Sequence, residues 1–557
     1  MASKVSKKEP LHSEVKILES LDTFLKKRAV FFFGLCIALT SLLCILLFDA
    51  RMSFAVDDAD YILMAHNFVK QGVFPTYHGG LYVIFLSLFM KLFGMNIPLF
   101  KALSAVSIVA QIIVIYFAFR GRVPYIVLFV VLLFLSVNPY FLYYGSQTFS
   151  EAFTMFVIAL FFLFGLAHLD KIEKDPDLRK TWLSWLGFGL GLLLLSLTKN
   201  ILIVAVLSAI VYFFLYRQWR SAGLTLLVFL IFKIPYELMV RTVFHGQTTS
   251  QLEQIMRVDF YNPSKGYEDF PMGYMSRLFE NFNRFVSVQM FKIVGIRPEH
   301  ATVRPDITDV EPSLILSVLF AALFVLAFRV LYKRNRYMMF CLLFSGVVCM
   351  ASCTVLQTIW SVQPRLILPF VPYFLLPLLA AAWYAVFKSK MAFIPMVYIA
   401  LMAVLIFIQL PLLFNKIDLN KKGLSHYLKG DISYNIEKVY PFQTHPEFRD
   451  FVLICDSIPW KVPKDSLIAN GNPGEALVYS GCTNFRRIAP VADKENADSV
   501  LMHLRRQKIA YLFADGNSKD VAMATQILID KYPQKLKLVS SSASSPDRNA
   551  YLFKINY

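Results

Sequence analysis

Long apolar stretches alternate with short polar segments along most of the chain. The apolar runs approach the length of about 20 residues that a membrane-crossing helix needs. We therefore predict a polytopic α-helical membrane protein with about 11 transmembrane helices. The predicted spans begin near Val30, Leu99, Val123, Ser150, Leu183, Ile201, Ala222, Ser313, Tyr337, Leu366 and Met391.

One further apolar segment, Leu81–Phe93, is short, carries Lys91 near its end and is bounded by glycines. The positive-inside rule decides where it belongs. If it does not cross and the N-terminus is cytoplasmic, basic residues fall in every short cytoplasmic loop; if it crosses, those loops move outside. We predict an interfacial or re-entrant helix and an outer C-terminus. The basic loop residues are Arg120, Arg122, Lys171, Lys174, Arg179, Lys180, Arg217, Arg220, Lys333, Arg334, Arg336, Lys388 and Lys390.

The pattern changes to mixed polar after the last predicted span. We predict a cytoplasmic N-terminal segment (1–29), a transmembrane domain (30–414) and an extracytoplasmic domain (415–557). Short apolar runs in the last part alternate with a helical pattern, which is typical of a small α/β domain. The first apolar run lacks a small-residue cleavage site, so we interpret it as a retained helix. The large outer loops are 49–98 and 239–312.

Composition excludes a soluble globular enzyme. Of the 557 residues, 57% are apolar and only 17% are charged, whereas soluble domains carry about a quarter charged residues. The net charge of +18 suggests nucleic acid in a soluble chain, but here much of it lies in loops that fix topology. No nucleic-acid partner is expected. The chain has no Walker loop, Rossmann glycine pattern or G-x-S-x-G motif, so nucleotide-driven chemistry is unsupported.

Five of the seven cysteines lie in apolar runs, and no C-x-x-C pair occurs. Cys455 and Cys482 lie in the polar tail, where they either pair, if the domain faces an oxidising compartment, or remain thiols. Asn262 is followed by Pro263, which forbids glycosylation there, and no usable N-x-S/T acceptor is found. This favours a bacterial envelope over an endoplasmic reticulum.

The first outer loop contains an acidic segment followed by helical spacing of apolar residues over Phe54–Phe68, with Gly72 as a stop. We predict an amphipathic helix on the outer surface. Its first turn favours ionised carboxylates because of the helix dipole. Asp57 either caps the helix while Asp58 and Asp60 form a solvated face, or these carboxylates carry chemistry.

Cations at the outer rim run against the charge bias and therefore call for a reason. Arg365 opens a predicted span, where its guanidinium either binds a phosphate or extends to the lipid headgroups. Lys199 lies between two predicted spans on the same side. Arg241, His245 and Arg257 begin the large second outer loop.

Glu151 and His78 have ordinary explanations beside functional ones. Glu151 follows Ser150 and suits a helix start. His78 is either solvated or contacts a sugar, an acceptor or a phosphate. His78 and His245 show no metal-ligand spacing, so we expect no required cofactor, although a divalent metal stays open.

Four outer segments match a known pattern in order and placement. Asp57-Asp58-Ala-Asp-Tyr61 is similar to D-E-x-x-Y, and Tyr77-His78-Gly79-Gly80-Leu81-Tyr82 to x-(H/K)-P-P-L-Y. Asn138-Pro139 is followed by Glu151, and the segment 365–372 is similar to R-Y-x-x-P-x-x-P. The chain thus resembles the GT-C superfamily of membrane glycosyltransferases, in the branch of protein O-mannosyltransferases and lipid A aminoarabinose transferases.

The sequence departs from that pattern at three places. Asp58 stands where glutamate is usual, Gly79-Gly80 replaces Pro-Pro and adds backbone freedom, and Leu366 replaces tyrosine. These changes bear on the acceptor and the pocket more than on the reaction class. The tail resembles the outer α/β domain of some members, with Arg486-Arg487-Ile-Ala-Pro490 in a typical place.

The resemblance implies an inverting transfer of sugar from a polyprenyl-phosphate donor to a lipid A, cell-envelope glycan or protein acceptor. It places the active site and the C-terminus on the periplasmic side of a bacterial inner membrane. Asp57 would be the general base, or a positioning group if the acceptor is a phosphate, with Asp58 beside it. The donor phosphate would be bound by Arg365, Lys199 and Arg241. Acceptor and sugar would be positioned by Tyr61, His78, Tyr82, Glu151 and His245.

Two other functions remain open at this stage. An oligosaccharyltransferase or ligase that moves a whole lipid-linked glycan would share this geometry. A lipid or sugar transporter would also have many spans, but transporters usually place polar substrate-binding residues near the bilayer midplane. Here the middles of the spans are nearly free of charge, apart from Lys233 and Glu237 toward one end.

Overall fold

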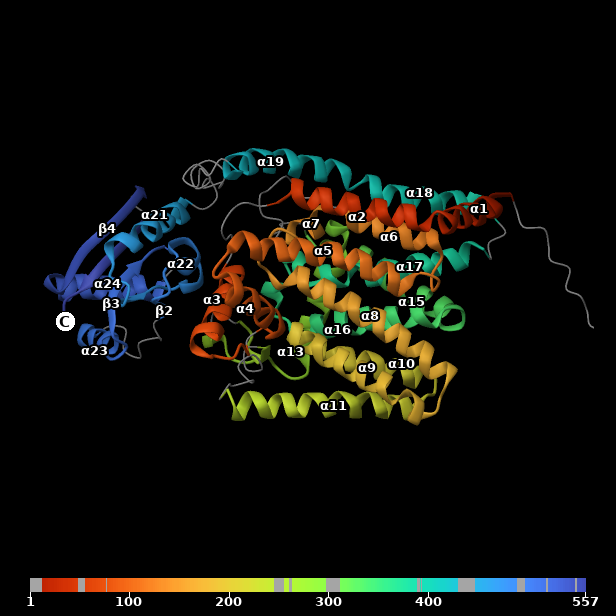
Figure 1. The fold of residues 1–557 in the computed structure, drawn as a ribbon, viewed down its shortest axis with the longest axis horizontal. Coiled ribbons are helices and arrows are strands. Elements are labelled where there is room, and N and C mark those ends of the chain that lie inside the picture. Colours follow the sequence, from red (N-terminus) through yellow and green to blue (C-terminus); the bar gives the residue numbers. More distant parts are fainter. Residues whose placement is uncertain are drawn as a thin grey trace, which may run out of the picture.

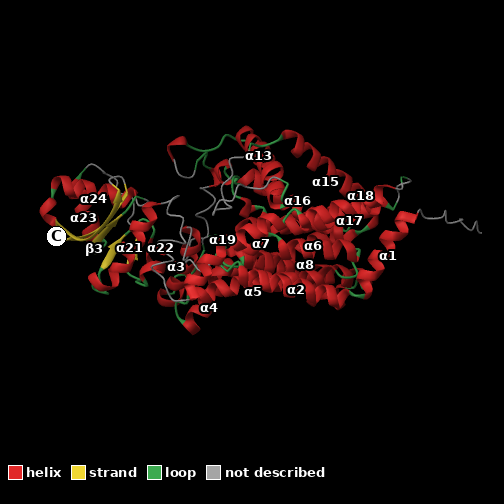
Figure 2. Cartoon of the chain, turned by 90° about the horizontal axis from the view of Figure 1, so that it is seen from above, coloured by secondary structure: helices red, strands yellow, loops and turns green. Residues whose placement is uncertain are grey.

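The structure is a computed structural model that describes residues 13–48, 56–76, 78–244, 255–259, 263–296, 311–387, 391, 393–428, 446–487, 496–516, 519–545 and 548–557. A bundle of long helices carries a small α/β domain at one end, and helix α1 (Ser13–Lys27) lies at the other end (Figure 1). Figure 2 shows the same arrangement from above. We call the end that carries the α/β domain the site end, because the candidate active site described below lies there, and we call the opposite end the far end. The described part of the chain begins at the far end and finishes at the site end, as a chain that passes through the bundle an odd number of times would.

Nine helices within the described ranges are long and apolar enough to cross a membrane, so the chain is an integral multi-pass membrane protein. Helix α8 is buried along most of its length, whereas α11 and α15 expose apolar side chains outward. The nine spans are α2 (Ala29–Leu46), α5 (Ile97–Phe119), α8 (Ser150–Lys174), α9 (Leu178–Thr198), α11 (Trp219–Thr242), α15 (Leu314–Arg334), α16 (Arg336–Val355), Leu368–Val386, which joins η6 (Leu368–Phe370) to α17 (Val371–Val386), and Phe393–Asp418, which joins α18 (Phe393–Phe407) to α19 (Leu410–Leu428).

The other two predicted spans form shorter apolar helices. Helix α6 (Tyr125–Val137) has 13 residues, and a 3₁₀ turn, η1 (Asn200–Val204), leads into α10 (Ala205–Leu215). Helix α6 ends early because Asn138 turns the chain and caps α7 (Pro139–Tyr144), accepting from the Tyr140 backbone N–H at 3.0 Å. All eleven predicted segments are therefore helical, but two are shorter than the sequence suggests.

Two helices at the site end do not belong to the spanning set. They are α3 (Val56–Gln71) and α4 (Leu81–Phe93), and α4 has the bounds of the predicted interfacial helix. Its position relative to a bilayer remains a prediction. The segment predicted to be the second outer loop and the loop before α17 add shorter elements: α13 (Met272–Arg284), the π-helical turn η3 (Phe285–Met290), α14 (Phe291–Ile293), η2 (Pro263–Lys265), η4 (Thr358–Trp360) and η5 (Pro364–Leu366).

Basic turns at the far end are bound to the end of α8. Asp170 accepts hydrogen bonds from Arg122 and from the Tyr337 hydroxyl, and Arg336 forms an ion pair with Glu173. Asn335 donates to the Arg122 carbonyl at 2.7 Å. Some of the charges that predict the topology thus also join three turns into one network.

The C-terminal domain has a five-stranded sheet in the order β2-β1-β3-β5-β4. The first three strands in this order pair in parallel, and β3, β5 and β4 pair antiparallel. This confirms the predicted small α/β fold. The elements are α21 (Pro446–Lys461), β1 (Leu467–Ala469), α22 (Pro473–Ser480), β2 (Phe485–Arg486), α23 (Ala497–Arg506), β3 (Ile509–Ala514), α24 (Lys519–Lys531), η8 (Pro533–Lys535), β4 (Leu536–Ser545) and β5 (Arg548–Ile555).

Cys455 and Cys482 are free thiols in the structure. Cys455 is completely buried in α21, and its burial raises the pKa of the thiol. Cys482 packs against the same hydrophobic cluster that contains Cys455, and a disulfide between them stays a prediction.

Candidate active site

Helix α3 presents the acidic segment at the site end of the bundle. Asp57 and Asp58 lie in its first turn, and Gly72, in the left-handed conformation with φ of +70°, ends it as predicted. Asp58 has no exposed surface, and its Oδ1 accepts from the Ala59 backbone N–H at 2.9 Å. The alternative of a merely solvated acidic face is thus wrong for Asp58. Asp60 is half-buried, and α22 partly covers it.

Asp57 forms an ion pair with Arg365, although 308 positions separate the two residues in the sequence. Arg365 Nη2 donates to Asp57 Oδ2 at 2.6 Å, and Arg365 Nε donates to the side-chain oxygen of Gln363 at 2.8 Å. The guanidinium also lies 5.3 Å from the centre of the Phe149 ring. Arg365 is therefore held against α3, with 18% of its side chain exposed.

A second ion pair connects α8 with the end of α9. Lys199 Nζ donates to Glu151 Oε1 at 2.8 Å, and Glu151 is almost fully buried. Its other oxygen, Oε2, is buried without a hydrogen-bond partner among the residues the structure describes. A buried carboxylate oxygen in this state is suited to accept from water or a substrate hydroxyl.

The loop between α3 and α4 carries His78 and packs against the end of α9. His78 has a φ of +58°, and Gly79 follows with a φ of +88°. A Cβ atom at Gly79 would lie 2.7 Å from the Thr198 carbonyl oxygen, and one at Gly80 would lie 2.4 Å from the Pro75 carbonyl oxygen. The glycine pair is thus explained by close backbone contacts, in addition to the conformational freedom expected from the sequence.

Two tyrosines, Tyr61 and Tyr82, lie between the acidic segment of α3 and the start of α8. The hydroxyl of Tyr61 lies 3.2 Å from the hydroxyl of Ser150, and its ring meets the Tyr82 ring edge-on at 5.2 Å. The Tyr61 and His78 rings are 6.5 Å apart. The predicted positioning residues Tyr61, His78, Tyr82 and Glu151 therefore lie in one cluster beside Asp57.

The cluster acts as one electrostatic unit. Burial lowers the pKa of His78 to about 4, while the charges of Asp57 and Glu151 oppose this and those of Lys199 and Arg365 reinforce it. Burial alone would raise the pKa of Asp57, but the Arg365 guanidinium and its hydrogen bond outweigh burial and lower that pKa. At neutral pH Asp57 is therefore ionised and His78 is uncharged.

The remaining predicted cations lie apart. Arg241 is exposed at the end of α11 and is not among the charges that act most strongly on Asp57 or His78. The end of α11 reaches the α3–α4 loop through rings instead, with Phe244 and Phe74 at 4.6 Å. The backbone of Arg257 forms an isolated antiparallel β-bridge with Tyr267, in the segment predicted to be the second outer loop. His245 lies outside the described residues.

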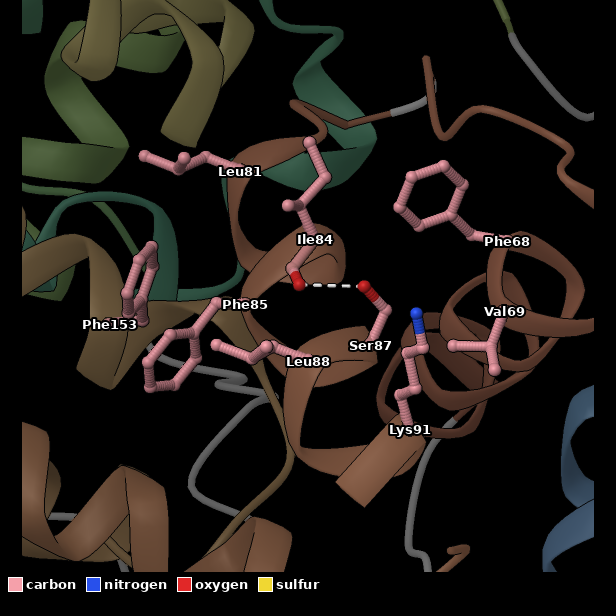
Figure 3. A pocket seen from close by; sticks show the side chains of 9 residues that line it. All are labelled: Phe68, Val69, Leu81, Ile84, Phe85, Ser87, Leu88, Lys91 and Phe153. Atoms are coloured by element: carbon pink, nitrogen blue, oxygen red, sulfur yellow. Dashed lines mark hydrogen bonds between the residues drawn. The ribbon is translucent and has the colours of Figure 1, made fainter. Parts of the chain in front are cut away.

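An apolar groove of about 530 Å³ adjoins the cluster (Figure 3). Its wall is shared with the site, because the Tyr82 ring packs on Phe153 at 5.7 Å. The Lys91 amine adds one positive charge to the lining. The groove is lined by Phe68, Val69, Leu81, Ile84, Phe85, Ser87, Leu88, Lys91 and Phe153.

No cluster of three or more His, Cys, Asp or Glu side chains suited to a metal occurs in the part of the chain that is described.

The sequence analysis missed two residues that support the site, Gln363 and Phe149. Gln363 could have been noticed because it stands two residues before Arg365. The contact with Phe149 had no signal in the sequence.

Comparison with known proteins by sequence gives no match, either to a protein family or to a curated protein. Comparison with solved structures does give matches. ArnT from Cupriavidus metallidurans, bound to undecaprenyl phosphate, superposes with a TM-score of 0.53 over 94% of this chain and 97% of its own, at 12% identity. The chain has the GT-C fold. The Archaeoglobus fulgidus oligosaccharyltransferase in its apo form, which also has the GT-C fold, gives 0.51 over 90% of this chain and 72% of its own, at 12% identity.

Proposed function

We propose that the protein is an inverting glycosyltransferase that moves a sugar from a polyprenyl-phosphate donor to an extracytoplasmic acceptor. The observation that carries this proposal is the pair of carboxylate–cation contacts, Asp57–Arg365 and Glu151–Lys199, gathered around His78. Two cations beside an ionised carboxylate supply both a phosphate-binding site and a base. The GT-C fold supports the reaction class at the level of fold.

The reaction would proceed by direct displacement. The acceptor oxygen attacks the anomeric carbon, its proton passes to Asp57, and the bond from that carbon to the phosphate oxygen breaks. The leaving polyprenyl phosphate keeps the electron pair, and Arg365 with Lys199 stabilises its charge. If the acceptor is itself a phosphate, no base is needed and Asp57 positions it.

The ion pair connects donor binding with the strength of the base. While Arg365 is bound to Asp57, the pKa of that carboxyl is lowered and it is a weak base. When the donor phosphate takes over the guanidinium, Asp57 loses part of this stabilisation and becomes more basic. Proton removal is thus favoured once the donor is bound.

The groove beside α4 suits the lipid part of the donor. Most of its lining is apolar, and it begins at Leu81 and Phe153, next to the cluster. An isoprenoid chain lying there would not need a water-filled route. Glu151 Oε2, which lacks a partner among the described residues, would accept from a sugar hydroxyl.

The orientation of the protein in the membrane is also part of this proposal. We place the site end and the C-terminal domain on the periplasmic side of a bacterial inner membrane, because the basic turns lie at the far end. Labelling of single introduced cysteines in intact cells tests this. Reagent that does not cross membranes should reach position 516 and not position 334.

The substrate is tested in cells and with purified protein. Lipid-linked sugars and envelope glycans should differ between cells with and without the gene, and the purified protein should transfer the accumulated sugar. A gain of one sugar on the acceptor supports the glycosyltransferase, whereas a gain of a whole glycan indicates the alternative, a ligase. No change in either pool would contradict both.

A further inference from the structure

The C-terminal domain packs directly on the helix that carries the acidic segment. Leu477 and Val478 of α22 are almost fully buried and belong to the hydrophobic core of the helical bundle. Figures 1 and 2 both show α22 beside α3. The C-terminal domain is thus attached to the site end by the apolar contact of α22 as well as by its covalent connection to the bundle.

The backbones of α22 and α3 meet at Gly474. A Cβ atom there would lie 2.7 Å from Asp60 Oδ1 and 2.9 Å from the Ala59 carbonyl carbon. A side chain at this position would therefore have to push the two helices apart, because part of the obstacle is backbone. Only glycine allows this approach without movement.

The turn that presents Gly474 is rigidly held. Asn470 is fully buried, donates to the Phe513 carbonyl at 3.0 Å and to Asp515 Oδ2 at 2.9 Å, and accepts from the Asn472 backbone N–H at 2.7 Å. The start of α22 is therefore fixed to strand β3. A contact from this turn can set the position of α3.

Asp60 transmits this contact toward the active site. It lies three residues after Asp57, so the two carboxylates share one side of α3. Asp60 is also close enough to Asp57, Asp58 and Arg487 to interact with each of their charges. Asp60 and Gly474 thus lie between the site and the domain.

We infer that α22 holds α3 in its working position, with Gly474 and Asp60 as positioning residues for the Asp57 carboxylate. The C-terminal domain is then a built-in part of the catalytic arrangement. A displacement of about 1 Å of a reacting group can lower a rate by about 10²-fold. The activity consequence rests on the proposed function, whereas the contact itself does not.

The test compares Gly474→Val with Gly223→Ala in the full-length protein in detergent. Gly223 lies in α11 with open space around its Cα, so it serves as the control. Hydrogen exchange of the α3 amides should become faster in Gly474→Val and stay unchanged in the control. Unchanged exchange in α3 would overturn the inference, whether or not the protein is a transferase.

The kinetic part separates positioning from donor binding. Gly474→Val should lower kcat by at least roughly tenfold. KM for an undecaprenyl-phosphate-linked donor should change less than about threefold, because Arg365 and Lys199 lie on other elements and the donor phosphate replaces Asp57 as the partner of Arg365. Faster exchange with a wild-type kcat would overturn the positioning role. If Gly474→Val fails to fold, Gly474→Ala serves with the same two readouts. An inactive wild-type protein would reject the proposed function and leave the exchange result decisive.

Discussion

Each end of the helical bundle holds carboxylates paired with cations, but the two sets differ in how fully they are satisfied. At the far end, Asp170 uses both oxygens, one for Arg122 and the other for Tyr337. At the site end, Glu151 leaves Oε2 without a partner among the described residues. A saturated carboxylate holds turns together, whereas an unsaturated one can still accept a ligand. Charge alone does not separate the two kinds.

The largest effect is expected from Asp57→Asn. It keeps the shape of the side chain and removes the base, so transfer to a hydroxyl acceptor should fall by at least about 10²-fold. The rate of sugar transfer by the purified variant measures this, with donor binding as the control for folding. Near-normal turnover would remove Asp57 as the base.

The second-largest effect is expected from Arg365→Ala. A guanidinium that binds the phosphate before and during departure affects both steps, so KM for the donor should rise and kcat should fall by roughly 10²-fold. Arg365→Lys retains charge without the forked geometry and should lie between. A response to donor concentration equal to that of the wild type would mean that Arg365 has no phosphate to bind.

Asp170→Asn tests the other side of the comparison. It leaves Arg122 and Arg336 without their full partner and should lower the free energy of unfolding by about 1–3 kcal/mol, with little change in turnover per folded molecule. Thermal unfolding in detergent, followed together with activity, separates the two. A loss of turnover without loss of stability would place chemistry at the far end.

Asp60→Asn should have a smaller, pH-dependent effect. Burial, with the charges of Asp57 and Asp58 and against that of Arg487, raises the pKa of Asp60 to about 6. The folded state therefore loses stability as pH rises from about 4 through 6, where wild-type Asp60 ionises. The variant should match the wild type below pH 4 and be more stable above pH 6. Parallel unfolding curves at all pH values would contradict this.

Metal removal should change least. We propose that Arg365 and Lys199 neutralise the leaving phosphate, so dialysis against EDTA should leave the transfer rate within about twofold of its starting value. Re-addition of magnesium or manganese is the control. Activity that disappears with EDTA and returns with metal would assign this role to an ion.

The sequence predicted the elements of the site better than their contacts. Helical spacing located α3, and charge bias singled out Arg365 and Lys199, because both signals are local. The partners of these cations are remote in sequence, and the same residue types would have suited lipid headgroups or solvent. The burial of Asp58 and the approach of Gly474 to α3 could not be predicted, since both depend on how distant helices pack.

The burial of His78 has a consequence for the range of conditions in which the site can work. An ordinary histidine changes charge near neutrality and makes its surroundings sensitive to mild acidification. His78 is held among buried groups with a pKa of about 4, and Asp57 ionises below its usual range. Both therefore keep one charge state from about pH 5 to 8. In the absence of donor, mild acidification of the medium that the site faces would leave the charges of these two groups unchanged.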